Sequence, residues 1–356
     1  MKGLLLAGGH GTRLRPLTFT GNKHMLPIAN KPMLLYGLDH LRSAGIRDIG
    51  IILGPLKEGV VELLGDGSKH DVNITYIEQR EPLGLAHAVR ISEDFIAGEP
   101  FVMYLGDNLI KQGIAPLIDL FNAKKSACVI GVARVKEPDR YGIVAFDEQG
   151  QITRLVEKPK QYVGDYALVG IYLFTSVIFD AVRKLTPSWR GEFEITDAIQ
   201  LLLGGGQKVH VQFVQGWWKD TGRPEDLLEA NQLILHDLEP KIEGKIEEGA
   251  VTTGPLELGR GSTIRSGSTV RGPVIIGESC DIGPRAFVGP YTSIGNSVIL
   301  RNSEIENSVI MDNAQIDCGK RVIDSIIGKG ARIVNSHEGI PAGHKLILGD
   351  MTYISL

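Results

Sequence analysis

The chain has 356 residues, of which 43% are apolar and 22% are charged, and its net charge is −4. This composition is typical of a soluble globular protein with about two domains, and it excludes the global positive field that recruits nucleic acid. No apolar run approaches the roughly 20 residues of a membrane span, so we expect no membrane partner. Three scattered cysteines predict a reducing, cytoplasmic location.

The first two thirds of the chain alternate between strand-like and helix-like segments. Strands are expected at residues 2–7, 48–54, 72–79 and 101–107, helices at 32–45, 84–96 and within 224–242 up to a break at Pro240, and a hairpin turn at 147–150. Strands that alternate with helices predict an α/β fold, with a Rossmann-like, mixed but mainly parallel sheet covered on both faces. In such sheets ligands bind at the carboxyl ends of the strands, so we expect the active crevice there.

In the last third of the chain, apolar residues recur six positions apart. The positions expected to face inward are Leu258, Ile264, Val270, Ile276, Ile282, Val288 and Ile294, followed after a slip by Ile299, Ile305, Met311, Ile316, Val322, Ile327 and Ile333. This period is typical of a left-handed parallel β-helix, in which three hexapeptides form one triangular coil. We therefore predict a catalytic domain at 1–240, a β-helix at 241–335 that supports a homo-oligomer, and a capping tail at 336–356.

A glycine-rich loop, AGGHGTRLRP, follows the first predicted strand. Its glycines let backbone N–H groups approach an anion, and Arg13 can neutralise a phosphate. Two familiar phosphate loops do not fit, because no lysine follows Gly11 and Leu14 stands where a dinucleotide loop needs a third glycine. Lys23 and Lys31 follow in NKHMLPIANKPM. The sequence predicts a phosphate-binding loop of another kind.

Together these two stretches resemble the signature of sugar-1-phosphate nucleotidylyltransferases, GGxGTRLxPxT…K…LPxxxKP. Further blocks are similar to those of glucose-1-phosphate thymidylyltransferases: IEQREPLGLAHAV, YLGDN, RYGIV, VEKPK, GEFEITDAI and WWKDTGRPEDLLEAN. The resemblance covers residues 1–235, and the appended repeats resemble the longer form of the family. It implies that the chain uses Mg²⁺ and transfers a nucleotidyl group from dTTP, or UTP, to glucose 1-phosphate, which yields dTDP-glucose and pyrophosphate.

The resemblance also implies a role for individual residues. Arg13 would hold the leaving pyrophosphate, Lys23 the triphosphate and Lys158 the attacking phosphate. The nucleotide is expected to contact Leu6, Ala7, Gly8, Gly9, Gly11, Thr12, Arg13, Lys23, Gln79 and Gly84. Mg²⁺ is expected at Asp107 and Asp220, because two carboxylates leave room for phosphate oxygens and water.

The sugar phosphate is expected at Asn108, Tyr141, Gly142, Glu157, Lys158 and Val169, with Glu192 and Asp197 nearby. Glu157 and Lys158 are adjacent, and adjacent residues of a strand face opposite sides, so we expect the strand to end there, before Pro159. The amide of Gln79 can accept from a pyrimidine N3–H and donate to a neighbouring carbonyl, a pattern that suits thymine or uracil.

Three alternatives stay open. In the first alternative, the chain uses UTP or is a broader nucleotidylyltransferase. The reason is that His24 and Met25 stand where short thymidylyltransferases have Gln and an apolar residue. The second is acetyl transfer by the β-helix, although residues 254–335 contain no histidine to serve as a catalyst. The third is a regulatory homologue without turnover, although the expected catalytic residues are all present.

Overall fold

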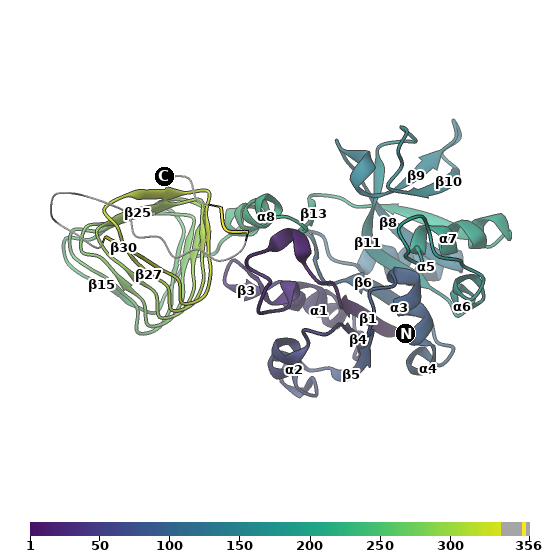
Figure 1. Ribbon diagram of the computed structural model, residues 1–356, viewed down its shortest axis with the longest axis horizontal. Helices are drawn as coiled ribbons and strands as arrows, with labels where there is room; N and C mark the ends of the chain where they lie inside the picture. The colour runs from purple at the N-terminus through teal and green to yellow at the C-terminus, as the bar shows by residue number, and fades with distance from the viewer. Residues whose placement is uncertain (336–350, 354–356) are drawn as a thin grey trace. The chain divides into compact units, whose positions relative to one another are not determined.

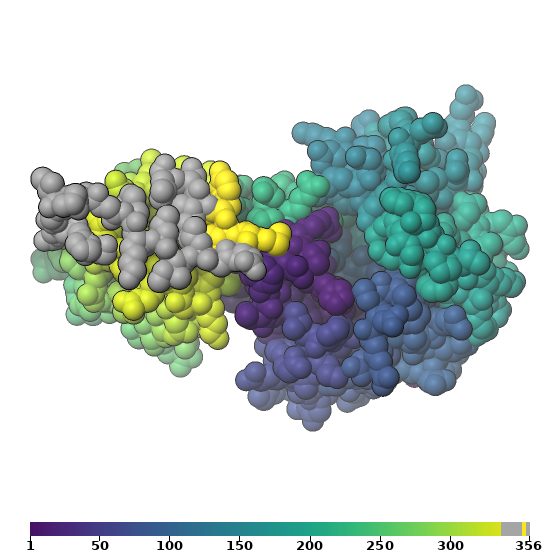
Figure 2. Space-filling model, viewed as in Figure 1, coloured from purple at the N-terminus to yellow at the C-terminus, as the bar shows by residue number. Residues whose placement is uncertain are grey.

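A computed structural model describes residues 1–335 and 351–353, and the remaining residues are drawn in grey in Figure 2. Most of the predicted tail therefore lies outside the described residues. The chain forms two compact units: the first contains Met1–Gly11, Thr20–Met25 and Met33–Asp220, and the second Thr12–Phe19, Leu26–Pro32 and the chain from Thr221 onward. The predicted boundary at residue 240 stays a prediction. None of the described helices has the length and apolar character needed to span a bilayer.

A mixed sheet forms the centre of the first unit (Figure 1). Its strands are β1 (Lys2–Ala7), β4 (Asp48–Leu53), β5 (Asn73–Glu78), β6 (Phe101–Leu105), β8 (Cys128–Arg134), β9 (Gly142–Phe146), β10 (Ile152–Glu157), β11 (Tyr166–Phe174) and β12 (Val209–Phe213). The order is β10-β9-β11-β6-β1-β4-β5, with β8 beside β11 and β12 beside β8. Strands β6, β1, β4 and β5 are parallel neighbours, which confirms the predicted fold class.

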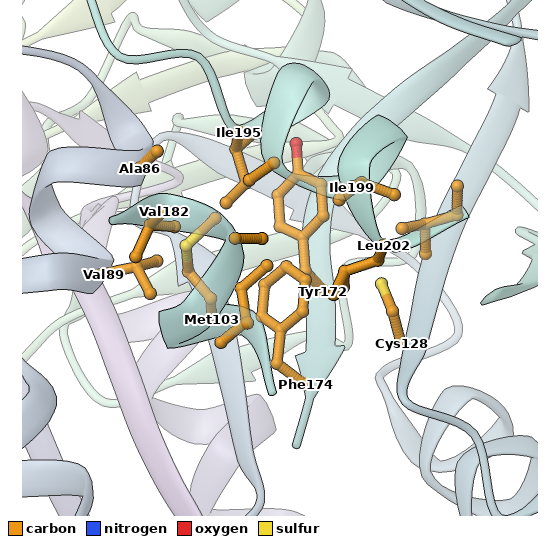
Figure 3. Close-up of a cluster of buried hydrophobic side chains, with 14 of the residues drawn as sticks. Ala86, Val89, Met103, Cys128, Tyr172, Phe174, Val182, Ile195, Ile199 and Leu202 are labelled. Carbon is orange, nitrogen blue, oxygen red and sulfur yellow. The ribbon is translucent and has the colours of Figure 1, made fainter. Parts of the chain in front are cut away.

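The helices of the first unit cover both faces of this sheet. They are α1 (Leu34–Ser43), α2 (Glu58–Leu64), α3 (Leu85–Ile91), α4 (Glu93–Ile96), α5 (Ala115–Lys124), α6 (Ile178–Val182) and α7 (Ile195–Gly204). Successive strand residues alternate between faces, so Leu4 of β1 packs with α3, α6 and α7, whereas Leu5 packs with α1, α2 and α5. Figure 3 shows the first of these cores around Tyr172 and Phe174.

One predicted helix of the first unit is two helices. The sequence predicted a single helix at 84–96, but α3 ends at Ile91 and α4 begins at Glu93. The hydroxyl of Ser92 donates to the carbonyl of Val89 at 2.7 Å. Serine side chains that bond to a nearby backbone group compete with helical hydrogen bonds, and this accounts for the break.

Several short elements belong to the two units. The strands β7 (Asn108–Ile110) and β13 (Trp218–Asp220) pair with each other in the first, and β2 (Pro27–Ile28) pairs with β3 (Lys31–Pro32) in the second, which also contains the turn at Thr12–Leu14. Single turns of 3₁₀-helix lie at Thr12–Leu14, Lys23–Met25, Ser68–His70 and Pro138–Arg140. The predicted hairpin is formed by β9 and β10, which are antiparallel.

The second unit contains a stack of triangular coils whose strands form three all-parallel sheets. One sheet contains β14 (Lys241–Ile242), β17 (Leu256–Leu258), β20 (Val274–Ile276), β23 (Thr292–Ile294), β26 (Val309–Ile310) and β29 (Ile326–Ile327). The next contains β15 (Lys245–Ile246), β18 (Thr263–Ile264), β21 (Asp281–Ile282), β24 (Ile299–Leu300), β27 (Gln315–Asp317) and β30 (Arg332–Val334). The third contains β16 (Val251–Thr253), β19 (Thr269–Arg271), β22 (Ala286–Val288), β25 (Ser303–Glu306) and β28 (Arg321–Ile323). This arrangement is consistent with the predicted left-handed β-helix.

The repeat changes its step at one place, and two of the predicted inward residues are wrong there. Leu300, rather than Ile299, pairs with inward-facing Ile282, and Ile310, rather than Met311, pairs with Ile294. Both Leu300 and Ile310 are 1% exposed. The six-residue step therefore continues to Leu300, and the coil then shortens at its corners.

Helix α8 (Pro224–His236) packs against the stack within the second unit. Its first turn carries Pro224, Glu225 and Asp226 and its last turn His236, an arrangement that suits the helix dipole. The helix ends earlier than predicted, because the backbone N–H of Leu238 bonds to the carbonyl of Leu235 and closes a tighter turn. Leu235 forms a small core with Ala29 and Ile275.

Candidate active site

The parallel strands of the first unit end at one edge of the sheet, where the predicted site residues follow them. Gly8 follows β1, Gln79 follows β5 and Asp107 lies two residues after β6. The paired registers of these strands place the three positions at the same edge, which is the arrangement expected of a ligand crevice in an α/β sheet. The topology therefore brings the ends of β1, β5 and β6 to one edge, and the binding roles of these residues stay a prediction.

The end of the Lys23 side chain lies over the glycine loop, next to Gly9. A β-carbon on Gly9 would lie 2.9 Å from Cε of Lys23, so a larger residue at position 9 would push the end of the lysine side chain away from this position. Leu6 and Ala7, both predicted to contact the nucleotide, are buried in β1. The carbonyl of Ala7 accepts a hydrogen bond from Nδ2 of Asn22 at 2.8 Å, which ties the Lys23 segment to the end of β1.

Lys23 and Asp107 form an ion pair at this edge. The ammonium group donates directly to Oδ2 of Asp107, and the two side chains are 13% and 15% exposed. Burial alone would raise the pKa of Asp107, but Lys23, and more weakly His24 and Asn108, lower it below its usual range. Asp107 is therefore an anion at neutral pH, and Lys23 is its counter-ion.

His24 is a buried neighbour of this pair. Burial and the adjacent Lys23 lower the pKa of His24 to about 3, against a smaller raising effect of Asp107, so the imidazole is neutral. Its Nδ1 lies 2.6 Å from Oδ1 of Asn22, which also accepts the backbone N–H of His24. The side chain of His24 is 2% exposed, so it packs into the protein interior next to the Lys23 segment.

Gln79 directs its amide into a small hydrogen-bonded group. Its Nε2 donates to the carbonyl of Gly84 at 3.1 Å and lies 3.0 Å from Nδ1 of His87. Burial, followed by the charge of Arg90, lowers the pKa of His87, which favours the neutral ring that can accept this hydrogen bond. Both amide hydrogens are thus engaged by the protein, and the Gln79 carbonyl oxygen lies beside Gly8.

Gly84 has a structural requirement of its own. Its φ is +100°, and a β-carbon would lie 2.5 Å from the carbonyl oxygen of Phe193. The backbone N–H of Phe193 in turn donates to Leu83 at 2.8 Å. The block GEFEITD, which the sequence placed near the sugar, therefore packs against the loop that carries Gly84.

Asp220 is brought to the same end of the unit by the β7–β13 pair. It lies opposite Asn108 in that pair, and Asn108 is the residue that follows Asp107 in the sequence. Nδ2 of Asn108 donates to Oδ1 of Asp107 at 3.0 Å, and Oδ1 of Asn108 accepts from the indole of Trp218 at 2.7 Å. The predicted sugar residue Asn108 is thus a buried link between both strands. Among the described residues, no cluster of three His, Cys, Asp or Glu side chains is placed to hold a metal.

The sugar-side residues gather where β10 ends. Glu157 is the last residue of β10, and Lys158 adopts φ +42°, which turns the chain out of the strand. As a result, Nζ of Lys158 lies 4.0 Å from Oε1 of Glu157. The backbone N–H of Lys158 donates to Tyr141 at 2.9 Å, and Gly142 lies opposite Glu157 in the β9–β10 pair.

Glu157 is surrounded by charged groups that sequence reasoning did not single out. Nη1 of Arg190 lies 3.5 Å from Oε1 of Glu157 and 3.2 Å from Oε1 of Glu194. Burial and, second, the Glu194 carboxylate raise the pKa of Glu157 to about 7, against lowering by Lys158, Arg190 and the Thr196 hydroxyl. Arg190 and Glu194 lie in or beside the block GEFEITD, and that adjacency was the available signal.

A cavity opens beside this cluster. It has a volume of about 560 Å³, and its lining includes Glu157, Ser188, Trp189, Glu194 and Asp197. Trp189 is 74% exposed at its rim. The strand registers place Glu157 and Asp107 on one edge, because β11 pairs near its start with β9 and further along with β6.

Four other predicted residues occupy different positions. The Tyr141 ring packs edge-on against Trp218, with 5.3 Å between centroids. Val169 is fully buried in a core cluster of the first unit, so its side chain does not face the site. Arg13 lies in the second unit with its guanidinium against Gly222, where a β-carbon would be 3.0 Å from Nη2. Thr12 begins the 3₁₀ turn that carries Arg13.

Comparisons with known proteins agree with this geometry. Residues 2–237 match the nucleotidyl transferase family, and residues 270–349 match the GMPPB C-terminal domain. The chain is 46% identical to the low-salt glycan biosynthesis nucleotidyltransferase of Haloferax volcanii, with 100% of both chains covered. It is 42% identical to the glucose-1-phosphate thymidylyltransferase of Streptomyces antibioticus, over 100% of this chain and 99% of that one.

Solved structures give the same result for the catalytic part. A crystal structure assigned as a glucose-1-phosphate thymidylyltransferase from Bacillus anthracis, in complex with a sucrose, has a TM-score of 0.63 and is 37% identical, covering 68% of this chain and 98% of that one. A UDP-glucose pyrophosphorylase with bound UDP-glucose has a TM-score of 0.60 at 26% identity, over 66% and 98% of the two chains. These relatives favour nucleotidyl transfer over the acetyl-transfer alternative. The chain therefore belongs to the nucleotidyl transferase family, in the form that carries a C-terminal domain of parallel strand coils.

Proposed function

We propose that this enzyme transfers the thymidylyl group of dTTP to glucose 1-phosphate and releases dTDP-glucose and pyrophosphate. An oxygen of the sugar phosphate forms a bond to the α-phosphorus, and the bond from that phosphorus to the bridging oxygen of pyrophosphate breaks. A sugar phosphate has its second pKa near 6, so it is already a dianion at pH 7 and needs no general base. The site must therefore position two anions and neutralise their charge.

The observation that carries the proposal is the grouping of Lys23, Asp107, Gln79 and Glu157 along one sheet edge. Lys23 is held by Asp107 where a triphosphate would need a cation. The Gln79 carbonyl is the part of its amide left to accept a pyrimidine N3–H, because its hydrogens bond to Gly84 and His87. Glu157 can accept from sugar hydroxyls, and Lys158 beside it suits the attacking phosphate.

Mg²⁺ fits the donor set of this site. Asp107 and Asp220 supply the hard carboxylate oxygens that this ion prefers; Asp220 ends β13, and Asp107 immediately precedes β7, the strand that pairs with β13. When bound, the ion would neutralise charge that develops on the transferred phosphate. Lys23 forms an ion pair with Asp107, so we expect its ammonium group to leave the carboxylate and pair with the triphosphate when substrates bind. Arg13 is assigned to the leaving pyrophosphate.

The relatives that are glucose-1-phosphate thymidylyltransferases support dTTP and glucose 1-phosphate as the substrates. The proposal is tested by steady-state release of pyrophosphate with dTTP, UTP and a panel of sugar 1-phosphates. We expect kcat/KM to be highest for dTTP with glucose 1-phosphate. A strong preference for UTP would overturn the thymidylyl assignment, whereas no release with any pair would overturn the enzyme assignment. We also propose a cytoplasmic location, because the three cysteines are free and buried.

A further inference from the structure

His87 is a half-buried histidine that contacts Gln79 from α3. It lies in the first turn of this helix, two residues after the start at Leu85. Side chains of a helix point back toward its N-terminus, so the His87 ring is directed toward the start of α3, where Gly84 and Gln79 lie. There Nδ1 of His87 lies 3.0 Å from Nε2 of Gln79. His87 therefore contacts the one side chain that is assigned to the base.

The ring of His87 is held in place by Phe193. The two rings are stacked, with 6.4 Å between their centroids and 29° between their planes. The backbone of Phe193 is fixed in turn, because its carbonyl accepts the N–H of Ala86 at 3.0 Å and its N–H donates to Leu83 at 2.8 Å. The helix and the segment around Phe193 together present the imidazole to Gln79 in one orientation.

The amide of Gln79 meets two groups on this side, and both require a donor from it. Nε2 donates to the carbonyl of Gly84 at 3.1 Å, and a carbonyl oxygen can only accept. The other hydrogen of Nε2 is the donor available to Nδ1 of His87, so Nδ1 carries a lone pair and the ring proton lies on Nε2. Gln79 is only 9% exposed, so a reversed amide would leave buried polar groups unmatched.

The other end of the same amide faces the glycine loop. A β-carbon on Gly8 would lie 3.4 Å from Oε1 of Gln79 and 3.4 Å from the backbone nitrogen of Gly54. Oε1 therefore lies where β1, β4 and β5 end, on the side of the proposed nucleotide. None of the residues that the structure describes donates a hydrogen bond to it. It is an acceptor that the protein itself leaves unused.

We propose, on the basis of the role proposed above for Gln79, that His87 is a positioning residue that selects the base without touching it. Because Nδ1 of His87 and the Gly84 carbonyl both accept from Nε2, the Gln79 amide offers only Oε1 to the nucleotide. An acceptor at this point bonds to the N3–H of thymine or uracil and opposes the N3 lone pair of cytosine. The enzyme therefore discriminates against dCTP.

Protonation of His87 weakens this selection. A proton on Nδ1 sets a donor against the Nε2 donor of Gln79, so the amide loses this bond or turns and presents Nε2 to the nucleotide. Burial and, second, Arg90 of the same helix lower the pKa of His87, while Glu81 on the preceding loop raises it by less. Phe193, which packs on the ring, is uncharged. The neutral and selective form is thus the one present at pH 7.

The test compares kcat/KM for dTTP with kcat/KM for dCTP, measured by pyrophosphate release with glucose 1-phosphate. His87→Leu removes the acceptor, and loss of this hydrogen bond should lower the dTTP-to-dCTP ratio about fivefold, with little change in kcat for dTTP. In His87→Asn the side-chain oxygen takes the place of Nδ1 and accepts in the same way. This variant should therefore restore most of the parent ratio.

The pH dependence of the ratio separates positioning from a merely structural role. In the parent the ratio should fall between pH 7 and pH 5, because His87 gains a proton as the pH drops through its lowered pKa. Phosphate groups that titrate in this range are common to both nucleotides, so their effect cancels in the ratio. His87→Asn has no titrating ring and reports any titration of the bases themselves, so it should lose less of the ratio than the parent.

His210→Leu is the matched control. His210 is also a half-buried histidine with a lowered pKa, and its Nδ1 lies 2.8 Å from the hydroxyl of Ser126. It lies near the start of β12, whose direction is that of β6, and therefore at the opposite edge of the sheet from Gln79. This variant is expected to keep the parent ratio at every pH.

The proposal is overturned if His87→Leu still turns over dTTP with the parent ratio, or if His87→Asn fails to restore it. It is also overturned if the parent and His87→Asn lose the ratio equally at low pH. Circular dichroism should show that each variant folds, and if His87→Leu does not, the pH comparison decides. Absence of pyrophosphate release by the parent with any nucleotide would instead overturn the proposed function.

Discussion

The side-chain oxygen of Asn231 accepts the backbone N–H of Ala29 at 2.8 Å, and so joins α8 to the hairpin that follows Lys23. The same oxygen accepts from the Ser293 hydroxyl at 2.9 Å, and Nδ2 donates to the carbonyl of Tyr291 at 3.0 Å. Asn231 is fully buried. One side chain thus connects three segments that are far apart in the sequence.

Replacing this side chain should loosen the hairpin. Asn231→Ala leaves buried backbone groups without partners, and each costs about 1–3 kcal/mol. We therefore expect a fall of that size in the free energy of unfolding, measured by denaturant titration, together with a lower kcat. Gln232→Ala is the control, because it removes one half-buried bond to Asn307 from the next position of the same helix. Equal losses in both variants would contradict the role of Asn231.

Lys23→Met should remove most of the catalytic activity while the fold survives. The change deletes the cation beside Asp107, and loss of one charge-stabilising group in an active site typically lowers kcat by about 10²–10³. Turnover with saturating substrates is the measurement. Lys57→Met is the control, because Lys57 pairs with Glu78 at the surface. Comparable turnover in both variants would remove Lys23 from the site.

The raised pKa of Glu157 should make stability depend on pH in a defined direction. The folded pKa is about 7 and the ordinary value 4.5, so between these values the folded chain holds a proton that the unfolded chain has released. Stability from this group is therefore present below pH 4.5 and is lost as the pH rises through 7. The melting temperature of the parent relative to Glu157→Gln should fall between pH 5 and pH 8. A constant difference would show that Glu157 has an ordinary pKa.

Gln79→Leu should impair recognition of the base. The substitution removes the acceptor offered to N3–H, and loss of one hydrogen bond to a ligand costs about 1 kcal/mol or more, which is roughly fivefold in KM. We expect KM for dTTP to rise at least that far while KM for glucose 1-phosphate stays within twofold. Equal increases for both substrates would indicate a general distortion of the site.

Thr292→Val should stabilise the coil stack. Thr292 is fully buried in β23, and none of the residues that the structure describes makes a hydrogen bond to its hydroxyl. Valine has nearly the same shape without the polar group, so the free energy of unfolding should rise by up to about 1 kcal/mol. Thermal unfolding measures this gain. A lower melting temperature would show that the hydroxyl has a partner when the protein is in solution.

Much of the fold could be predicted because local patterns determine it. The apolar run of β1 and the six-residue period of the coils follow from burial and from side-chain direction, and both appear in the structure. The predicted inward positions are shifted by one residue at Ile299. Ile299 and Leu300 are both aliphatic, so the six-residue period alone does not show which of them faces inward. Only the paired register with Ile282 identifies Leu300 as the inward residue.

The candidate site was predictable where a motif carries the chemistry and less so where folding assembles it. Lys23 and Asp107 are 84 positions apart, yet both stood out in their motifs and are joined by an ion pair. Arg190 is an arginine among several in the sequence, and its contact with Glu157 depends on how the segment after α6 folds back toward β10. The raised pKa of Glu157 depends on burial and on Glu194, which no spacing rule reveals.

The shortened corners after Leu300 show that phase, rather than length, is what the coil stack preserves. Ile305 and Ile310 follow Leu300 at five-residue steps and still face inward, at 0% and 1% exposure. Residues can therefore be lost at a corner without consequence for the coils that follow. A single deletion inside a strand would not be tolerated in the same way, because it would exchange the inward and outward positions of the residues that follow it in the strand. Evolution of this domain should consequently proceed by trimming turns and by adding or removing entire coils.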